Sequence, residues 1–199
     1  LAFWCLSSSV YSLIVFLMKI ILFGHQNWGI EAIRTLNGTN HELAYVYTHP
    51  IDMDKNEKVW YDSLSLECKK AGIPYEEKKS LNENDIKKIQ ELNPDLILSM
   101  GWRRLLPSSI FKIPKFGTIN FHDGLIPKYK GFAPINWSII NGENETGLTS
   151  HYIDASADTG DIIHQERISI SNNETAFDVY KKLLKFTQPM LKNILQDIK

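Results

Sequence analysis

Residues 18–24 have the sequence MKIILFG, a short run of mostly branched apolar residues that ends in glycine. A run of this length, closed by a turn residue, is typical of a strand buried on both faces. Such strands occur mainly in parallel sheets that helices cover on each side. Residues 18–24 therefore predict that an α/β domain opens at Met18.

The chain after this strand continues to alternate between apolar runs and amphipathic stretches. Further strands are expected at 42–48, 95–100 and 117–121, with hairpin-like strands near 147–153 and 161–168. Helices are expected at 28–36, 59–71, 82–92, 105–113, 133–141 and 174–199, the last one after a capping-box pattern at 171–174. Short connections between alternating elements predict an α/β fold: a mostly parallel sheet with helices on both faces and an antiparallel edge. Ligands of such sheets bind at the carboxyl ends of the strands.

The composition is that of a single globular domain. The 199 residues include 22 basic and 23 acidic side chains, 43% are hydrophobic, and the net charge is −1. These values exclude the disordered, collagen-like and coiled-coil classes, and they argue against a dedicated nucleic-acid surface, which is usually strongly basic. Cys5 and Cys68 give no disulfide framework or metal-binding spacing and suit a reducing compartment.

Several common site motifs are absent from the sequence. The turn GHQNWG at 24–29 follows the first strand but is neither a dinucleotide-binding fingerprint nor a P-loop. The helix start there could bind an anion or be a plain tight turn. The acidic residues of 154–161 do not match the spacing of a calcium loop, and no His-Glu-x-x-His or Cys-x-x-Cys is present, so we expect no metal. No serine lies in a nucleophile-elbow context.

An amide and an imidazole stand two residues apart in the expected strand at 117–121 and the turn after it. Side chains alternate between the faces of a strand, so Asn120 and His122 point to the same side at its carboxyl end. A lone Asn-x-His pair is more often a hydrogen-bonded strand end than a catalytic site. The surrounding residues must decide between these two interpretations.

These residues belong to a longer series of motifs. The series comprises NFHDGLIP at 120–127, Gly131, APINW at 133–137, NGE at 141–143, ETG at 145–147 and DTGD at 158–161. In order and spacing it closely resembles the folate-dependent formyltransferases, most tightly over 117–164. One departure is Gly124-Leu125-Ile126-Pro127, where the family commonly has Ser-Leu-Leu-Pro.

The resemblance implies a Rossmann-like catalytic domain at residues 18–199 and transfer of a formyl group from the co-substrate 10-formyltetrahydrofolate to a primary amine, without a metal. The implied catalytic residues are Asn120, His122 and Asp158. Asn120 is expected to donate to the oxyanion, His122 to relay a proton, and Asp158 to orient the imidazole. The residues expected to bind the co-substrate are Met100, Gly101, Trp102, Asp154, Ala157, Thr159, Gly160 and Asp161. Those expected to bind the acceptor are Arg103, Arg104, Lys128, Tyr129 and Lys130.

The acceptor amine is expected to be a small molecule, a nucleotide-linked amino sugar. The near-zero net charge and the sequences WRR at 102–104 and HDG at 122–124 favour this acceptor. Methionyl-tRNA is the second candidate. Two further alternatives are hydrolysis of the formyl-folate donor and a catalytically inactive binding module.

The first 18 residues contain no charged side chain. Three interpretations compete: a membrane span, which needs about 20 apolar residues; a signal peptide, although no basic start or small-residue cleavage site is visible; or a true start at Met18. The formyltransferase resemblance uses 18–24 as the first strand of its sheet, so a span would have to fit within residues 1–17. We therefore expect 1–17 to lie outside the native fold, with no membrane segment and a cytoplasmic location.

Overall fold

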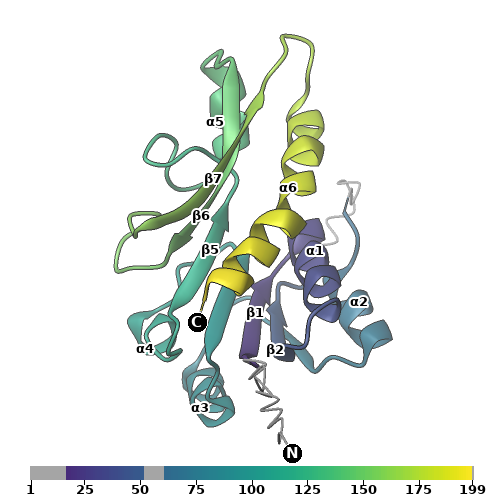
Figure 1. The fold of residues 1–199 in the computed structure, drawn as a ribbon, viewed down its shortest axis with the longest axis vertical. Helices are drawn as coiled ribbons and strands as arrows, with labels where there is room; N and C mark the ends of the chain where they lie inside the picture. The colour runs from purple at the N-terminus through teal and green to yellow at the C-terminus, as the bar shows by residue number, and fades with distance from the viewer. Residues whose placement is uncertain (1–16, 52–60, 199) are drawn as a thin grey trace, which may run out of the picture.

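A computed structural model describes residues 17–51 and 61–198 (Figure 1). The elements, in chain order, are β1 (Lys19–Gly24), α1 (Gln26–Asn37), β2 (Glu42–Thr48), α2 (Leu64–Ala71), β3 (Tyr75–Glu77), α3 (Glu83–Leu92), β4 (Leu96–Met100), α4 (Ser108–Phe111), β5 (Thr118–His122), α5 (Pro134–Ile140), β6 (Glu145–Tyr152), β7 (Ile162–Ser169) and α6 (Ala176–Asp197). The strands form one sheet in the order β3-β2-β1-β4-β5-β6-β7. Pairs from β3 to β5 are parallel, whereas β6 and β7 pair antiparallel. The predicted α/β fold with an antiparallel edge is confirmed.

Helices cover both faces of the sheet because its central strands are apolar on both sides. In β1, Ile20 and Leu22 pack into the core beneath α1, α2 and α6, whereas Ile21 and Phe23 pack into the core beneath α3 and α4. All four side chains are 0% exposed. Alternation along one strand thus supplies two cores, as expected for a strand buried on both faces.

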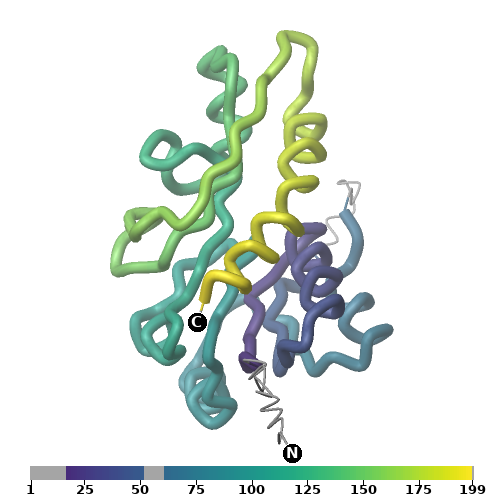
Figure 2. Tube along the Cα trace, viewed as in Figure 1, coloured from purple at the N-terminus to yellow at the C-terminus, as the bar shows by residue number. Residues whose placement is uncertain are grey.

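The last helix closes the fold against the first one. Figure 2 shows the C-terminal helix α6 running alongside α1, although they stand at opposite ends of the chain. The rings of Trp28 and Tyr180 meet edge to face with centroids 5.1 Å apart. The Gln188 side-chain amide donates to the Glu31 carboxylate at 2.6 Å. These contacts hold the first βα turn in place against the rest of the domain.

The helices α2 and α6 begin later than the sequence pattern predicts, because their capping residues lie further along the chain. The helix expected from residue 59 begins at Leu64, where the Ser63 hydroxyl accepts from the Leu66 N–H. The capping box predicted at 171–174 forms only a turn. The box that starts α6 pairs Thr175 with Asp178. A pattern of capping residue types therefore located the helix start to within a few residues only.

The short edge strand β3 was missed. It has only three residues, Tyr75–Glu77, two of them charged, and it pairs with β2 at the sheet edge. A charged edge strand carries no apolar alternation to detect, although charge at an edge protects it from pairing with other chains. The expectations for residues 1–16 and for the first two residues of the helix predicted at 59–71 fall outside the described residues. Among the helices of residues 17–51 and 61–198, none has both the length and the apolar character that crossing a bilayer requires.

Replacing Leu98 by alanine tests how much the central strands contribute to the free energy of unfolding. Leu98 is 0% exposed in β4, whereas Leu66 on α2 is 58% exposed. Leu98→Ala should lower the free energy of unfolding by about 2–5 kcal/mol through lost burial and a residual cavity. The matched Leu66→Ala change should alter it by no more than about 0.5 kcal/mol. Urea denaturation of the two variants measures this difference, and equal losses would contradict the assignment of β4 to the core.

Candidate functional site

A cavity of about 460 Å³ opens at the carboxyl ends of the parallel strands. Its walls come from the start of α1, the ends of β4 and β5, the turn into α5, and the loop after β6. The lining residues are Gln26, Trp28, Ser99, 101–106, 120–123, 131–134, His151 and 153–158. This is where ligands of open α/β sheets bind. The cavity is therefore the candidate site.

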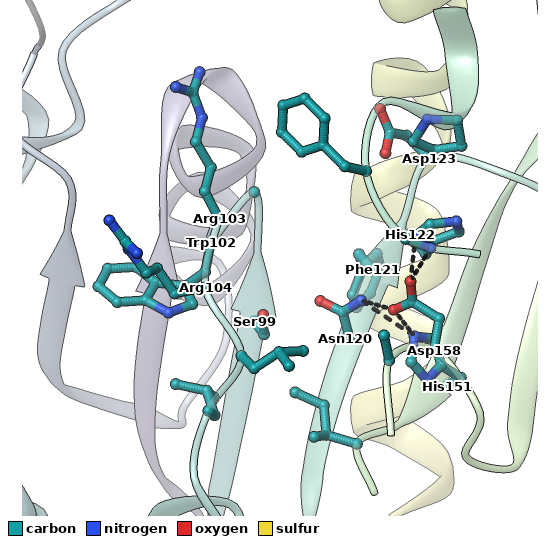
Figure 3. A pocket seen from close by; sticks show the side chains of 18 of the residues that line it. Ser99, Trp102, Arg103, Arg104, Asn120, Phe121, His122, Asp123, His151 and Asp158 are labelled. Carbon is teal, nitrogen blue, oxygen red and sulfur yellow. Dashed lines mark hydrogen bonds and ion pairs between the residues drawn. The ribbon is translucent and has the colours of Figure 1, made fainter. Parts of the chain in front are cut away.

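The Asp158 carboxylate joins three side chains at one wall of this cavity (Figure 3). Its Oδ2 lies 3.4 Å from His122 Nδ1 and accepts from the Gly131 N–H at 2.8 Å. Its Oδ1 lies 3.3 Å from His151 Nε2 and 3.4 Å from Asn120 Nδ2. The structure thus brings together Asn120, His122 and Asp158, which the sequence analysis singled out.

Strand geometry explains how these groups converge. Asn120 and His122 lie on the same side of β5, two residues apart. His151 stands directly across the antiparallel β5–β6 pair from Asn120. Asp158 comes from the loop after β6 and has a left-handed backbone with φ of 51°, a conformation that is uncommon outside glycine. Backbone strain at this position is consistent with a functional loop.

The hydrogen bonds of the site fix the charge of Asp158 and the orientation of its neighbours. Burial alone would raise the pKa of Asp158, but the hydrogen bond with His151, the charge of His122 and the Gly131 N–H together lower it below its ordinary value. The carboxylate is therefore ionised at neutral pH. His122 Nε2 lies 2.8 Å from the Tyr129 carbonyl oxygen, which fixes the ring from its other side.

The Asn120 amide is oriented toward the carboxylate rather than into the cavity. Its Nδ2 lies 3.1 Å from His151 Nε2 and 3.4 Å from Asp158 Oδ1, while its oxygen points toward the Ser99 side (Figure 3). Donation to a bound substrate, as expected from the sequence, requires Asn120 to give up one of these contacts. The longer one, to Asp158, is a weak hydrogen bond.

Two residues of the site were missed by the sequence analysis. His151 is 1% exposed, and only the pairing of β6 with β5 reveals that it faces Asn120. Asp123 lines the cavity, and its carboxylate forms no ion pair with any described residue. Burial raises the pKa of Asp123, although the charge of His122 opposes the shift. The sequence did offer a signal that Asp123 belongs to the site, because its acidic side chain directly follows the candidate catalytic residue His122.

The eight residues expected to bind the co-substrate divide into two groups. Gly101, Trp102, Asp154 and Ala157 line the cavity, whereas Met100, Thr159, Gly160 and Asp161 do not. Met100 is 0% exposed and packs into the core beneath α1.

The other three residues that miss the cavity shape the loop after β6 instead. The Thr159 hydroxyl donates to the Asp154 carboxylate at 2.5 Å, and the Asp161 carbonyl accepts from the Tyr152 N–H at 3.0 Å. Gly160 lies against the backbone of Tyr152, where a Cβ atom would come within 2.0 Å of the carbonyl oxygen. These three residues therefore support the loop and do not line the cavity, and their contact with a co-substrate stays a prediction.

The residues expected to bind the acceptor divide in the same way. Arg103 and Arg104 line the cavity, but the turn at 128–130 does not. Lys128 Nζ and the Tyr129 hydroxyl each donate to the Glu143 carboxylate at 2.6 Å, so both side chains are held away from the cavity. Sequence spacing gave no sign of this acidic partner across the turn.

No group of three or more His, Cys, Asp or Glu side chains within residues 17–51 and 61–198 is arranged to hold a metal ion. Among the groups that line the cavity are an amide, two imidazoles and the carboxylates of Asp123, Asp154 and Asp158. Such groups can bind a polar oxygen and exchange protons with a substrate in the cavity.

A family model described as "Formyl transferase" matches residues 18–195. The chain belongs to the formyl transferase family. The resemblance seen in its motifs is thus confirmed, and the matched range begins at the first strand and includes every residue of the Asp158 network. Solved structures share the fold of this formyl transferase. Phosphoribosylglycinamide formyltransferase from Bacillus halodurans has a TM-score of 0.74 at 21% identity, covering 91% of this chain and 97% of that one.

Named relatives are more similar in sequence. Methionyl-tRNA formyltransferase of Clostridioides difficile (strain 630) is 36% identical over 182 residues, which are 90% of this chain and 59% of that protein. The bifunctional polymyxin resistance protein ArnA of Wigglesworthia glossinidia brevipalpis is 37% identical over 190 residues, 91% of this chain and 29% of that protein. This formyl transferase therefore spans well under two thirds of the length of these relatives.

Gly124 stands where the family commonly has serine. In this structure its surroundings leave little room for a side chain. A Cβ atom there would lie 2.8 Å from Pro134 Cβ and 3.0 Å from His122 Nε2. Gly124→Ala should therefore push the imidazole or the start of α5 aside and cost about 1–3 kcal/mol of stability. Gly38→Ala is the matched control, because its Cβ would meet only the Thr35 carbonyl at 3.4 Å.

Denaturation midpoints and the NMR signals of the His122 ring measure the effect of Gly124→Ala. The ring signals should shift in Gly124→Ala and stay unchanged in Gly38→Ala. Unchanged His122 signals and unchanged stability in Gly124→Ala would show that the close packing at this position is not required.

Proposed function

We propose that residues 18–199 form a catalytic domain that transfers the formyl group of 10-formyltetrahydrofolate to a primary amine. The observation that carries this proposal is the junction at Asp158, where an amide, two imidazoles and a carboxylate meet at a cavity wall. Membership of the formyl transferase family supports it. Acyl transfer to an amine needs an oxyanion donor and a proton acceptor, and the junction supplies both kinds of group.

The reaction divides into two steps. The amine nitrogen attacks the formyl carbon, a C–N bond forms, and the carbonyl oxygen becomes an oxyanion. The former amine nitrogen loses a proton, and the bond from the carbon to the folate N10 then breaks while N10 gains a proton. The products are a formamide and tetrahydrofolate, and neither an oxidant nor a reductant is consumed.

Each residue of the junction has a role in this proposal. Asn120 exchanges its 3.4 Å contact with Asp158 for a hydrogen bond to the oxyanion, keeping its contact with His151. Hydrogen bonds of a catalytic site commonly shorten only when substrate is bound. His122, held between Asp158 and the Tyr129 carbonyl, relays the proton to the leaving nitrogen, and the ionised Asp158 accepts the proton of the amine.

The cavity suits a flat, partly polar donor. Its volume of about 460 Å³ lies within the usual range for small-molecule sites. Trp102, Leu106 and Ile153 add apolar side chains to its lining. An N-formyltransferase from Helicobacter canadensis, solved in complex with folinic acid and dTDP-3-aminofucose, has a TM-score of 0.71 at 24% identity, over 90% of this chain and 63% of that one. Its folinic acid supports a folate donor here.

The acceptor we favour is a nucleotide-linked amino sugar. The dTDP-3-aminofucose in the H. canadensis structure is a ligand of this class. In the present chain, the Asp123 carboxylate in the cavity wall offers a partner for an amine, since a partly buried charge is costly unless it is paired. Arg103 and Arg104 offer guanidinium forks to phosphate on the opposite wall.

Methionyl-tRNA is the second candidate acceptor. Methionyl-tRNA formyltransferases of C. difficile and Alkaliphilus oremlandii (strain OhILAs) are 36% and 33% identical to this chain. The chain covers 59% and 58% of those two proteins. The matched part therefore supports the shared formyl-transfer chemistry more directly than it supports recognition of tRNA.

Removing the amide or the carboxylate of the junction tests the assignment of the catalytic groups. Asn120→Ala and Asp158→Ala should each lower kcat by about 10²–10³-fold, the usual cost of losing an oxyanion donor or a similarly placed group. Asn136→Ala removes an exposed amide on α5 and should leave kcat unchanged. Single-turnover formyl transfer by variants with wild-type denaturation midpoints measures the effect. Wild-type rates in either junction variant would contradict the mechanism.

Donor consumption with different amines tests the acceptor. Loss of 10-formyltetrahydrofolate should depend on an added dTDP- or UDP-linked amino sugar and yield one formamide per donor. Turnover with methionyl-tRNA alone would select the second candidate. Loss without any amine would show a hydrolase, and no loss under any condition would show a binding module, so each of these three results would contradict the favoured acceptor.

A further inference from the structure

The turn at residues 128–131 supplies two backbone groups to the junction at Asp158. The Tyr129 carbonyl oxygen lies 2.8 Å from His122 Nε2, and the Gly131 N–H donates to Asp158 Oδ2 at 2.8 Å. The first contact fixes the imidazole, and the second fixes the carboxylate. The positions of both groups therefore depend on the path of this turn, although the side chains of 128–130 do not line the cavity.

The Tyr129 carbonyl decides which nitrogen of His122 always carries a hydrogen. A carbonyl oxygen can only accept a hydrogen bond, so His122 Nε2 holds a hydrogen and donates it to Tyr129. Nδ1 is then the nitrogen that faces Asp158 Oδ2, at 3.4 Å. In the proton relay proposed above, Nδ1 therefore takes up and releases the proton, while Nε2 keeps its own. Without the carbonyl, a neutral ring could hold its hydrogen on either nitrogen.

The backbone of Tyr129 has an unfavourable conformation that other contacts must maintain. Its φ of 58° lies in the left-handed region, which is uncommon for a residue with a bulky side chain. Gly131 has a φ of 89° at little cost, because it lacks a Cβ atom. Strained conformations persist only where the surrounding structure holds them. The turn therefore needs an anchor at Tyr129.

Glu143 anchors this turn from outside the cavity. Its Oε1 accepts from the Tyr129 hydroxyl and from Lys128 Nζ, each at 2.6 Å. The Asn141 amide also donates to the Tyr129 hydroxyl, at 3.2 Å. The Glu143 N–H donates to the Ser138 carbonyl at 3.0 Å, which ties the anchor to the end of α5. The end of a short helix thus holds the tip of the Tyr129 side chain.

The Glu143 carboxylate is a strong hydrogen-bond acceptor. Hydrogen bonds from Lys128 and Tyr129 lower the pKa of Glu143 below its ordinary value, so the group is ionised at neutral pH. Hydrogen bonds to an ionised acceptor are shorter and stronger than those between neutral groups. The side chain of Glu143 is only 23% exposed, and it does not line the cavity. Its contacts are therefore directed at the turn and not at a ligand of the cavity.

We propose that Glu143 is a positioning residue of the reaction, which acts through Tyr129 to hold His122 with its hydrogen on Nε2. The proposal rests on the formyl-transfer function proposed above and adds to it a residue outside the cavity. Glu143 touches neither the donor nor the acceptor. Its effect reaches the reacting atoms through two contacts, from Glu143 to the Tyr129 hydroxyl and from the Tyr129 carbonyl to His122.

NMR of the two ring nitrogens of His122 tests this role without any turnover. In the wild-type chain, Nε2 should carry its hydrogen throughout. Glu143→Ala and Tyr129→Phe should each give signals of a mixture, in which part of the hydrogen has moved to Nδ1. Glu143→Gln keeps an oxygen that accepts from the Tyr129 hydroxyl and should retain the wild-type signals. Glu145→Ala removes a neighbouring exposed carboxylate, which pairs with Arg167, and should also leave the signals unchanged.

Formyl-transfer kinetics measure the consequence of losing the anchor. Glu143→Ala and Tyr129→Phe should each lower kcat about tenfold and leave KM for both substrates unchanged, because a displaced catalytic group weakens the transition state and not the binding of substrates. Glu143→Gln should recover most of this loss, and Glu145→Ala should show none. The double variant should lose no more than either single variant, since both changes break the same contact.

Three results would overturn the role of Glu143. The first is wild-type ring signals of His122 in Glu143→Ala, and the second is an equal loss of kcat in Glu143→Ala and Glu143→Gln. The third is a loss of kcat that follows a lower denaturation midpoint while the ring signals stay unchanged, which would show a structural role only. Altered ring signals in Glu143→Ala, in a protein that formylates no amine, would instead refute the proposed function and leave the hold of Glu143 on His122 intact. The two failures are therefore distinguishable.

Discussion

The Asp158 carboxylate is the group on which the arrangement of the site depends. A partly buried carboxylate is costly unless its oxygens are hydrogen-bonded, and here the partners come from three separate segments: β5, β6 and the turn at Gly131. Moving any one of these segments would remove at least one of the four contacts to the carboxylate oxygens. The same contacts that stabilise the ionised carboxylate therefore also fix the relative positions of the two imidazoles and the amide.

The antiparallel edge of the sheet makes this junction possible. It also explains why the loop after β6 needs residues that stabilise its path. Because β6 runs opposite to β5, it ends at Tyr152, opposite Ile119 and away from the carboxyl end of β5. The loop that follows must fold back along β5 to bring Asp158 to His122. The Thr159 hydroxyl donates a hydrogen bond to the Asp154 carboxylate, and Gly160 packs closely against Tyr152. Both contacts stabilise the path of this loop. Residues that do not touch the cavity thus determine where the carboxylate lies.

Sequence patterns predicted those parts of the molecule that depend on local periodicity or on side chains from one strand. The parallel core strands and the Asn120–His122 pair are of this kind. Contacts between distant segments were missed, because spacing along the chain does not encode them. His151 enters the site only through the β5–β6 register, and Lys128 and Tyr129 turn to Glu143 rather than to the cavity. The three-residue strand β3 was too short and too charged to carry an apolar pattern.

The near-zero net charge of the chain conceals a separation of charge at the sheet's carboxyl edge. Asp123, Asp154 and Asp158 line the larger cavity, whereas Lys79 lines the smaller neighbouring one, and Arg103 and Arg104 lie between the two. Acidic side chains around one cavity and basic side chains around the next would orient a polar ligand as it approaches this edge. This separation of charge is a local property of one edge of the sheet, and the net charge of the chain does not reveal it.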